Sequence, residues 1–307
     1  MSSERAAAPP RRRLPRPRSG RGLLMVPPVL VVLAVLVAPI VLIALYSVDV
    51  KTNLPFTPTK FTWSMWRDFL PPSQGKYPNP FWHRFEVSMV ITVIVSLVAV
   101  TAAYPLAYFL AFVPRRSRYT LLLLMLAPFF TSYLLRVIAW KIMLSNSGVI
   151  NTALWDLHLR AHGNGIPWLI YSKFSVGLVL FYSWVPFVAV PIFVLLDNLD
   201  TSLLEAAQDL GANRFATFLR VTLPLSVPGV IAGFVFVLIP TTGEFITPLL
   251  VGGPDSQMFG NSIQSFFQDT PNWNYGAVLA LWLVAVVFVM LLVFGRFLST
   301  DLQEANT

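Results

Sequence analysis

The acidic residue deepest within an apolar stretch of the chain is Glu244. A charged side chain at the centre of a membrane helix costs about 2.5–3.5 kcal/mol on insertion scales, so such a residue usually faces a partner or a water-filled path. Pro240 and Gly243, just before it, favour a kink in a helix. We therefore expect Glu244, with Gly243 and Phe245, to line a translocation path and attract a cationic solute, or else to form a structural ion pair.

Two cations, Arg136 and Lys141, lie in another apolar stretch. If they face inward, either of them can pair with Glu244, or both can repel a cation on the same path. The sequence leaves these readings open, because it does not show which way the side chains point. We place Tyr133 and Arg136 beside Glu244 as candidate residues of the path.

Other chemistry is poorly supported by the sequence. His158 and His162 are four residues apart, but Leu159 stands where the zinc motif H-E-x-x-H requires Glu, so we expect no metal site. Cysteine is absent, and the pair Gly75-Lys76 lacks the other residues of a phosphate-binding loop. The chain is therefore expected to bind no cofactor and to be no enzyme, and any ATP must be hydrolysed by another polypeptide.

The composition is that of a membrane protein. Of the 307 residues 56% are hydrophobic and 12% are charged, whereas soluble domains carry about 25% charged residues. The net charge of +8 comes from basic residues in short segments rather than on a folded face, which favours contact with membrane lipid and argues against nucleic acid.

Six stretches are apolar and long enough to cross a bilayer as helices. We expect spans at about residues 24–47, 86–112, 119–144, 174–196, 225–250 and 274–297. They form one permease domain over residues 23–300, between a disordered Arg/Pro-rich tail at 1–22 and a short tail at 301–307. Short basic segments mark the cytoplasmic side, which puts both termini in the cytoplasm. These segments hold the arginines of the N-terminal tail and Arg115, Arg116, Arg118, Arg214, Arg220 and Arg296.

The loop at about residues 197–224, between spans four and five, is predicted to form two short helices. Ser202 and Glu205 fit a capping box at the start of the first helix. Gly211 supplies a left-handed residue that ends it. Asn213 is suited to cap a second helix that runs to about Thr222.

Pro224 is expected to stop this second helix. Its buried stripe is expected at the helical spacing i, i+3, i+4 and i+7. The residues at this spacing are Phe215, Phe218, Leu219 and Thr222.

The spacing of this loop carries a resemblance. The loop contains Glu205-Ala206-Ala207, then three residues, Gly211, nine further residues and Val221-Thr222-Leu223-Pro224. This pattern resembles the EAA loop of permease subunits of binding-protein-dependent ABC importers. The same residues also have a purely structural reading. Glu205 can close a capping box, Gly211 can end the helix, and Ala206 and Ala207 can be present because alanine favours helix formation. The resemblance implies an all-α fold of six transmembrane helices with a cytoplasmic coupling loop that docks on an ATPase. The residues implied in coupling are Glu205, Ala206, Ala207, Gly211, Leu223 and Pro224.

Two further runs are similar to the polyamine (spermidine and putrescine) permease subfamily. They are Ile239-Pro240-x-x-Gly243-Glu244-Phe245-x-x-Pro248 and Thr131-Ser132-Tyr133-Leu134-x-Arg136. The resemblance implies a prokaryotic inner-membrane location and a second permease subunit. It also implies two ATP-binding subunits that hold ATP and Mg, and an extracytoplasmic solute-binding protein. Alternatives are the same machinery with an opine, amino acid or other small organic solute, or an ion-coupled secondary transporter, in which the EAA-like loop has no role.

Overall fold

The computed structural model describes residues 21–48, 61–71, 73–74, 77–159, 165–269 and 272–304. Residues 1–20 of the predicted N-terminal tail, His162, and residues 305–307 of the predicted C-terminal tail lie outside this part. The chain forms two compact units, residues 1–43 and 44–307. α1 (Arg21–Ser47) begins two residues inside the predicted tail, and only its residues up to Ile43 belong to the first unit. Its side chains from Val26 to Leu42 are all exposed, as in a helix that is apolar on every side.

The second unit contains the other predicted spans. Spans two, four and six are single helices, namely α3 (Pro80–Phe112), α7 (Lys173–Asp197) and α13 (Trp273–Glu304). Among the described residues, five helices in the chain are long and apolar enough to cross a membrane. A bent pair of helices makes a sixth span when the pair is counted as one. The predicted all-α fold is confirmed.

The prediction of an unbroken third span is wrong. α4 (Arg115–Leu126) is followed by a 3-10 turn, η1 (Ala127–Phe130), and then by α5 (Tyr133–Leu144) and α6 (Val149–Asp156). The two halves of the span differ in direction by 82°. Pro128 has no N–H to continue the α-helical ladder, and the backbone at Thr131 is extended.

The predicted fifth span is also broken rather than kinked. α10 (Leu223–Thr242) keeps Pro240 inside the helix but ends at Gly243, and α11 (Ile246–Val251) begins three residues later. A 3-10 turn, η3 (Pro254–Ser256), and α12 (Phe259–Gln268) follow and lead to α13. The segment predicted as one membrane helix is therefore two helices joined by an irregular turn.

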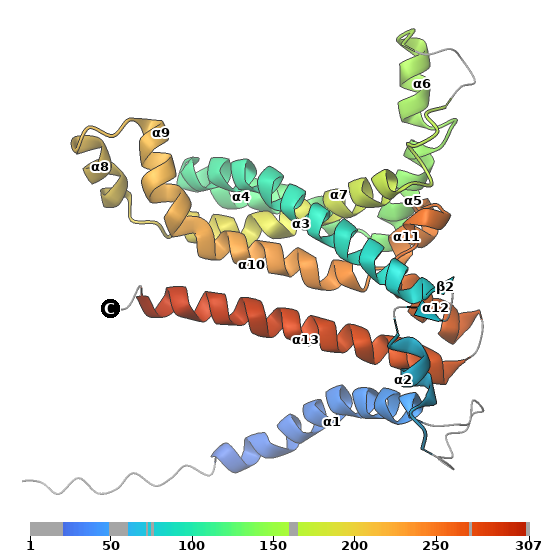
Figure 1. Ribbon diagram of the computed structural model, residues 1–307. Coiled ribbons are helices and arrows are strands. Elements are labelled where there is room, and N and C mark those ends of the chain that lie inside the picture. The colour runs from blue at the N-terminus through green and yellow to red at the C-terminus, as the bar shows by residue number, and fades with distance from the viewer. Residues whose placement is uncertain are drawn as a thin grey trace, which may run out of the picture. The chain divides into compact units, whose positions relative to one another are not determined.

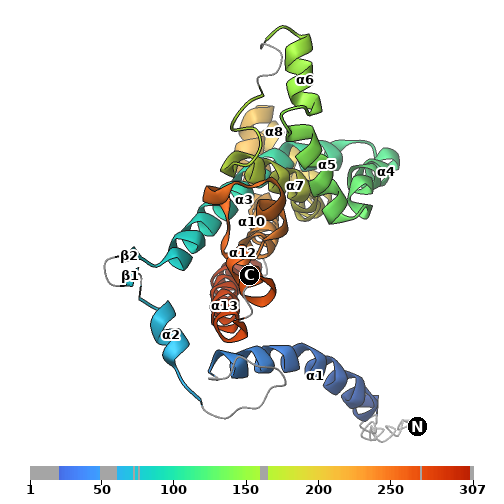
Figure 2. The same ribbon diagram turned by 90° about the vertical axis from the view of Figure 1, so that its right-hand side faces the viewer.

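Close packing of α3, α7 and α10 forms the core of the second unit, and α13 lies along α10 (Figures 1 and 2). Ala99, Ala103 and Ala107 on α3 are fully buried. Such small side chains allow membrane helices to approach closely, which favours dispersion contacts between backbones. The same principle applies to Gly229 and Gly233, where α10 crosses α7.

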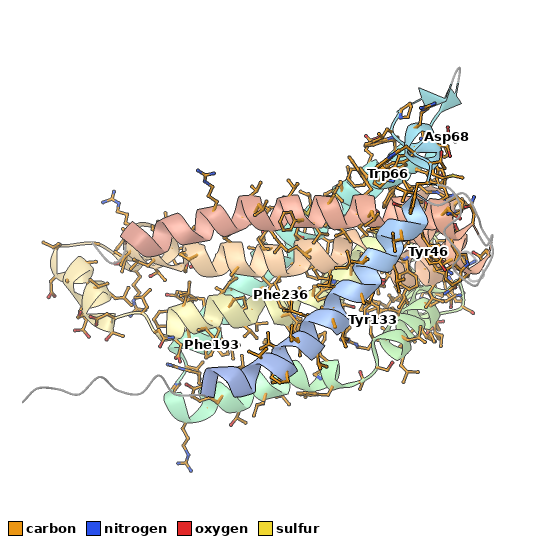
Figure 3. The ribbon with its side chains drawn as sticks, turned by 90° about the horizontal axis from the view of Figure 1, so that it is seen from below. Tyr46, Trp66, Asp68, Tyr133, Phe193 and Phe236 are labelled. Carbon is orange, nitrogen blue, oxygen red and sulfur yellow. The ribbon has the colours of Figure 1, made fainter. Side chains whose placement is uncertain are left out.

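An aromatic cluster closes one end of this unit. α2 (Ser64–Phe69) packs on α13, and Phe69 stacks on Trp82 with ring centroids 5.6 Å apart. The indole of Trp82 donates to the carbonyl of Phe69 at 3.1 Å. Figure 3 shows Trp66 at this end of the unit and Phe193 towards the other. A two-residue ladder, β1 (Ser73–Gln74) with β2 (Tyr77–Pro78), precedes α3, with Ser73 opposite Pro78.

We predict that Gly229→Ala weakens the contact between α7 and α10. A Cβ at this position would lie 2.9 Å from the carbonyl oxygen of Pro191. This oxygen belongs to the backbone, so it cannot rotate away as the end of a side chain can. Overpacking of this kind costs about 1–3 kcal/mol, so the thermal midpoint of the purified protein should fall. Gly295→Ala on α13 is the matched control, since a Cβ there meets nothing within 4 Å. Equal midpoints for the two variants would contradict the packing described.

Candidate functional site

The break between α10 and α11 is organised by the side chain of Glu244. Its Oε1 accepts hydrogen bonds from the backbone N–H groups of Phe245, Ile246 and Thr247, at 3.1, 2.8 and 3.2 Å. These are donors at a helix start, which have no partner inside their own helix. The carboxylate therefore caps the first turn of α11 and stabilises the break between the two helices.

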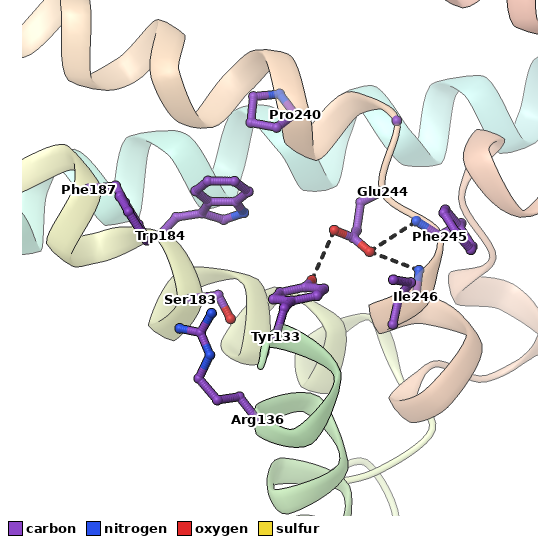
Figure 4. Close-up of a pocket in the computed structure, with 10 residues that line it drawn as sticks. Tyr133, Arg136, Ser183, Trp184, Phe187, Pro240, Glu244, Phe245 and Ile246 are labelled. Atoms are coloured by element: carbon purple, nitrogen blue, oxygen red, sulfur yellow. Dashed lines mark hydrogen bonds between the residues drawn. The ribbon is translucent and has the colours of Figure 1, made fainter. Parts of the chain in front are cut away.

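The second oxygen of Glu244 links this break to α5. Tyr133, the first residue of α5, donates its hydroxyl to Oε2 at 2.9 Å (Figure 4). The same hydroxyl lies 2.6 Å from Oγ1 of Thr247, which can donate in turn. The start of the second half of span three is thus joined to the break in span five.

α12 supports the break from the other side. The amide of Asn261 donates to the carbonyl of Phe245 at 2.8 Å. A Cβ on Gly260 would lie 2.6 Å from the carbonyl oxygen of Gly243 and 2.7 Å from that of Glu244. Glycine is therefore required at position 260 for α12 to lie this close to the turn.

A pocket with a volume of about 440 Å³ lies beside this turn, between α5, α7 and the α10–α11 break (Figure 4). It brings together all five residues that the sequence suggested for a path, although their role in translocation stays a prediction. The lining residues are Tyr133, Arg136, Ser183, Trp184, Phe187, Pro240, Gly243, Glu244, Phe245 and Ile246. Sequence reasoning missed Ser183 and Trp184, whose only signal is the presence of polar atoms within an apolar span.

The ion pair left open for Glu244 is not formed. In the described part of the chain, neither Arg136 nor Lys141 lies within ion-pair distance of this carboxylate, whose oxygens accept the hydrogen bonds above. The guanidinium carbon of Arg136 instead lies 4.5 Å from the ring centre of Phe129 and 5.8 Å from that of Tyr133. Cation–π attraction therefore holds Arg136 at the wall of the pocket.

The predicted loop is a separate feature, at one end of the bundle in Figure 1. It begins with α8 (Thr201–Asp209), and the cap predicted for this helix is wrong. Asp200, rather than Ser202, is the N-cap, and its carboxylate accepts from the N–H of Ser202 at 2.9 Å. This hydrogen bond lowers the pKa of the exposed Asp200 carboxyl below its usual value. Because the helix starts earlier than predicted, Glu205 closes no capping box and its side chain stays exposed.

The turn after α8 agrees with the prediction. Gly211 has φ +86°, the left-handed conformation that ends a helix. Asn213 caps α9 (Arg214–Thr217) by accepting from the N–H of Ala216 at 2.8 Å.

The end predicted for the second helix is wrong. α9 continues through a π-turn, η2 (Phe218–Thr222), directly into α10. Pro224 lies in the first turn of α10, directly after the π-turn, and does not end the helix.

The predicted buried stripe is found only in part, since Thr222 is buried and Phe218 is half-buried against Tyr104 and Tyr108. Phe215 and Leu219 are exposed by 69% and 43%, whereas Thr217 and Thr222 are buried. The two buried residues are five apart, which is the spacing of the π-turn between them.

Small and exposed side chains surround this loop. Glu205 and Ala206 are exposed, and a hollow of about 390 Å³ between α8 and α9 is lined by Ala207 and Gly211 among others. Leu210 beside it is 89% exposed, which is costly for an apolar side chain in water. Of the proposed coupling residues, Ala207 and Gly211 thus line this hollow, Glu205 and Ala206 are exposed on α8, and Leu223 and Pro224 begin α10.

An ion pair lies at the start of this loop. The guanidinium of Arg118 on α4 donates to the carboxylate of Asp197, the last residue of α7. Tyr119 donates to the other oxygen of Asp197 at 3.4 Å. The first half of span three is therefore fixed to the end of span four, directly before α8.

Apolar helices long enough to cross a bilayer, with two broken spans among them, indicate a multi-pass membrane protein. Over residues 22–306 the chain matches the family described as binding-protein-dependent transport system inner membrane component, and it belongs to that family. It is thus a permease subunit of an ABC importer in the inner membrane, not an enzyme and not an ion-coupled secondary transporter.

Curated relatives and solved structures agree with this family. The chain is 36% identical over 220 residues to the spermidine/putrescine transport system permease protein PotB of Escherichia coli (strain K12), covering 69% of this chain and 77% of the relative. PotB of Haemophilus influenzae is 34% identical over 220 residues, with 72% and 74% covered. A chain from a bacterial ABC transporter involved in alginate import has a TM-score of 0.69 at 16% identity, over 91% of this chain and 95% of that chain, which shows the fold.

We predict that Glu244→Ala lowers the thermal midpoint of the purified importer, whereas Glu244→Gln leaves it close to the wild-type value. Alanine leaves the N–H groups of Phe245, Ile246 and Thr247 without an acceptor, at a cost of about 2 kcal/mol or more. Glutamine keeps one acceptor oxygen for these groups and turns its amide N–H₂ towards the hydroxyl of Tyr133. The comparison separates the capping role of this side chain from its charge. A midpoint unchanged in Glu244→Ala would refute the capping role.

Proposed function

We propose that this chain forms the translocation path of an ATP-driven importer for polyamines, with spermidine and putrescine as its solutes. The observation that carries the proposal is the similarity to permeases named for spermidine and putrescine, which extends over more than two thirds of the chain. Residues 23–300 act as one permease domain. The path runs past the pocket at the α10–α11 break.

The chemistry of the pocket supports a cationic solute. The carboxylate of Glu244 supplies negative charge at the wall of the pocket, and near protein atoms Coulomb attraction is stronger than in bulk water. The aromatic rings of Tyr133, Trp184 and Phe187 offer faces to an ammonium group. The volume of about 440 Å³ falls within the ordinary range of sites for small molecules, about 300–1,000 Å³.

The exposed loop supports a partner that supplies the energy. α8 presents Glu205 and small alanine side chains, and Leu210 adds an apolar surface that a docked protein would cover. In the proposed assembly, two ATP-binding subunits hold ATP and Mg, and one of them docks on α8 and α9. A second permease subunit completes the path, and a solute-binding protein delivers the solute at the opposite face. Both termini of the chain lie on the cytoplasmic side with the loop.

Uptake of labelled spermidine and putrescine by cells with and without this chain tests the proposed solute. Deletion should abolish uptake and the wild-type gene should restore it. Glu244→Gln should restore uptake only in part, with a loss of about tenfold for a lost attraction of about 1.4 kcal/mol, while the assembly still forms. Full restoration by this variant would show that the charge of Glu244 has no part in transport. Unchanged uptake after deletion would point to another cargo.

We predict that Glu205→Lys separates ATP hydrolysis from uptake. The substitution reverses the charge of an exposed side chain on α8, so the helices should fold normally while docking of the ATP-binding subunit weakens. Co-purification of the ATP-binding subunits should fall, and ATP hydrolysis should no longer respond to the loaded binding protein. Gln208→Lys is the control, because it adds positive charge to the same helix without removing the carboxylate. A Glu205→Lys importer that transports at the wild-type rate would exclude this role.

A further inference from the structure

One side of the pocket offers hydrogen-bond donors that nothing in the described chain accepts. Nε and Nη1 of Arg136, the hydroxyl of Ser183 and Nε1 of Trp184 are all buried without a hydrogen-bond partner. A buried donor without an acceptor costs free energy, and most such groups in folded proteins are paired. The coincidence of three such side chains in the lining of one pocket indicates a ligand that supplies acceptors.

The positive charge of Arg136 is also unbalanced. Glu244 is the acidic residue of the pocket lining, and its oxygens serve Tyr133 and the start of α11. The rings of Phe129 and Tyr133 lie near the guanidinium carbon, at 4.5 and 5.8 Å. Aromatic faces attract the cation but leave its N–H edge free to donate.

We propose that the pocket contains an anion subsite that binds a single carboxylate group. Arg136 supplies the charge, and Ser183 and Trp184 supply two further donors. The planar guanidinium matches a carboxylate in charge and geometry. The carboxylate has two possible sources, a free small carboxylate or the carboxylate of an imported solute that also carries an ammonium group.

The position of Glu244 makes the pocket bipolar. In Figure 4, Tyr133 lies between Glu244 and Arg136, so the two charged side chains stand on different sides of the space. A solute with an ammonium group at one end and a carboxylate at the other would meet a complementary charge at each. This inference goes beyond the proposed function, because the anion subsite stands on its own residues whether or not the cargo is a polyamine.

Thermal unfolding of the complete importer, purified with its partner subunits, tests the subsite without a transport assay. Acetate is titrated against acetamide, which has the same shape without the charge, at constant ionic strength set by a bulky sulfonate buffer. Acetate should raise the midpoint in a saturable manner and acetamide should not, since a ligand that binds the folded state stabilises it. Ornithine and putrescine, which differ by one carboxylate, are compared in the same way.

Variants locate the effect in the pocket. Arg136→Gln should abolish the shifts with acetate and ornithine, and Trp184→Phe, which removes one donor to a charged group, should weaken the apparent affinity about tenfold. Lys141→Gln is the matched control, since it removes a cation from the same helix but lies outside the pocket lining. If Arg136→Gln does not fold, Trp184→Phe and Ser183→Ala carry the test.

Each outcome decides the proposal. Ornithine acting at a lower concentration than acetate would identify a carboxylate carried by the solute, and acetate acting alone would identify a free anion. The proposal is overturned if neither compound shifts the midpoint of the wild-type importer, or if the shifts persist in Arg136→Gln. If the uptake assay shows that this importer does not carry polyamines, the midpoint shifts expected here stay the same. The two proposals can therefore fail separately.

Discussion

The start of a helix leaves backbone N–H groups without partners inside that helix, and this constraint determines the structure around Glu244. A chain that breaks one helix and begins another must find other acceptors for the donors that it frees. The carboxylate of Glu244 accepts from the first three N–H groups after the break and holds the hydroxyl of Tyr133 with its other oxygen. The turn, the start of α5 and the wall of the pocket therefore depend on one side chain.

The two broken spans are coupled because their breaks meet. Span three breaks before Tyr133, and span five breaks at Glu244, two residues that share a hydrogen bond of 2.9 Å. α12 packs against the same turn through the hydrogen bond of Asn261 and the close approach of Gly260. The pocket is the space left where two interrupted helices cannot pack as continuous rods. The breaks supply Tyr133 and Glu244 to its lining, and the unbroken helix α7 supplies Ser183 and Trp184.

The sequence predicts the spans well and their interruptions poorly. Apolar length alone locates all six membrane segments, since crossing the hydrocarbon core sets a minimum length. Pro240 and Gly243 indicate a kink, but a break requires that the carboxylate of Glu244 turns back onto the chain, which no local pattern encodes. Leu219 is exposed where a buried residue was predicted, because it lies within a π-turn, which adds one residue to the helical period. Ser183 and Trp184 carry no motif, and their part in the pocket depends on how α7 packs.

The continuity of α9, the π-turn and α10 determines how the loop can transmit force. A proline that ended the helix at position 224 would have made a soft joint between the loop and the membrane. Because the backbone instead runs helically from Arg214 to Thr242, the second helix of the loop and the membrane helix form one continuous segment. α10 alone, from Leu223 to Thr242, is about 30 Å long at 1.5 Å per residue. Its far end is the turn that Glu244 holds, so a single helical segment joins the exposed loop to the wall of the pocket.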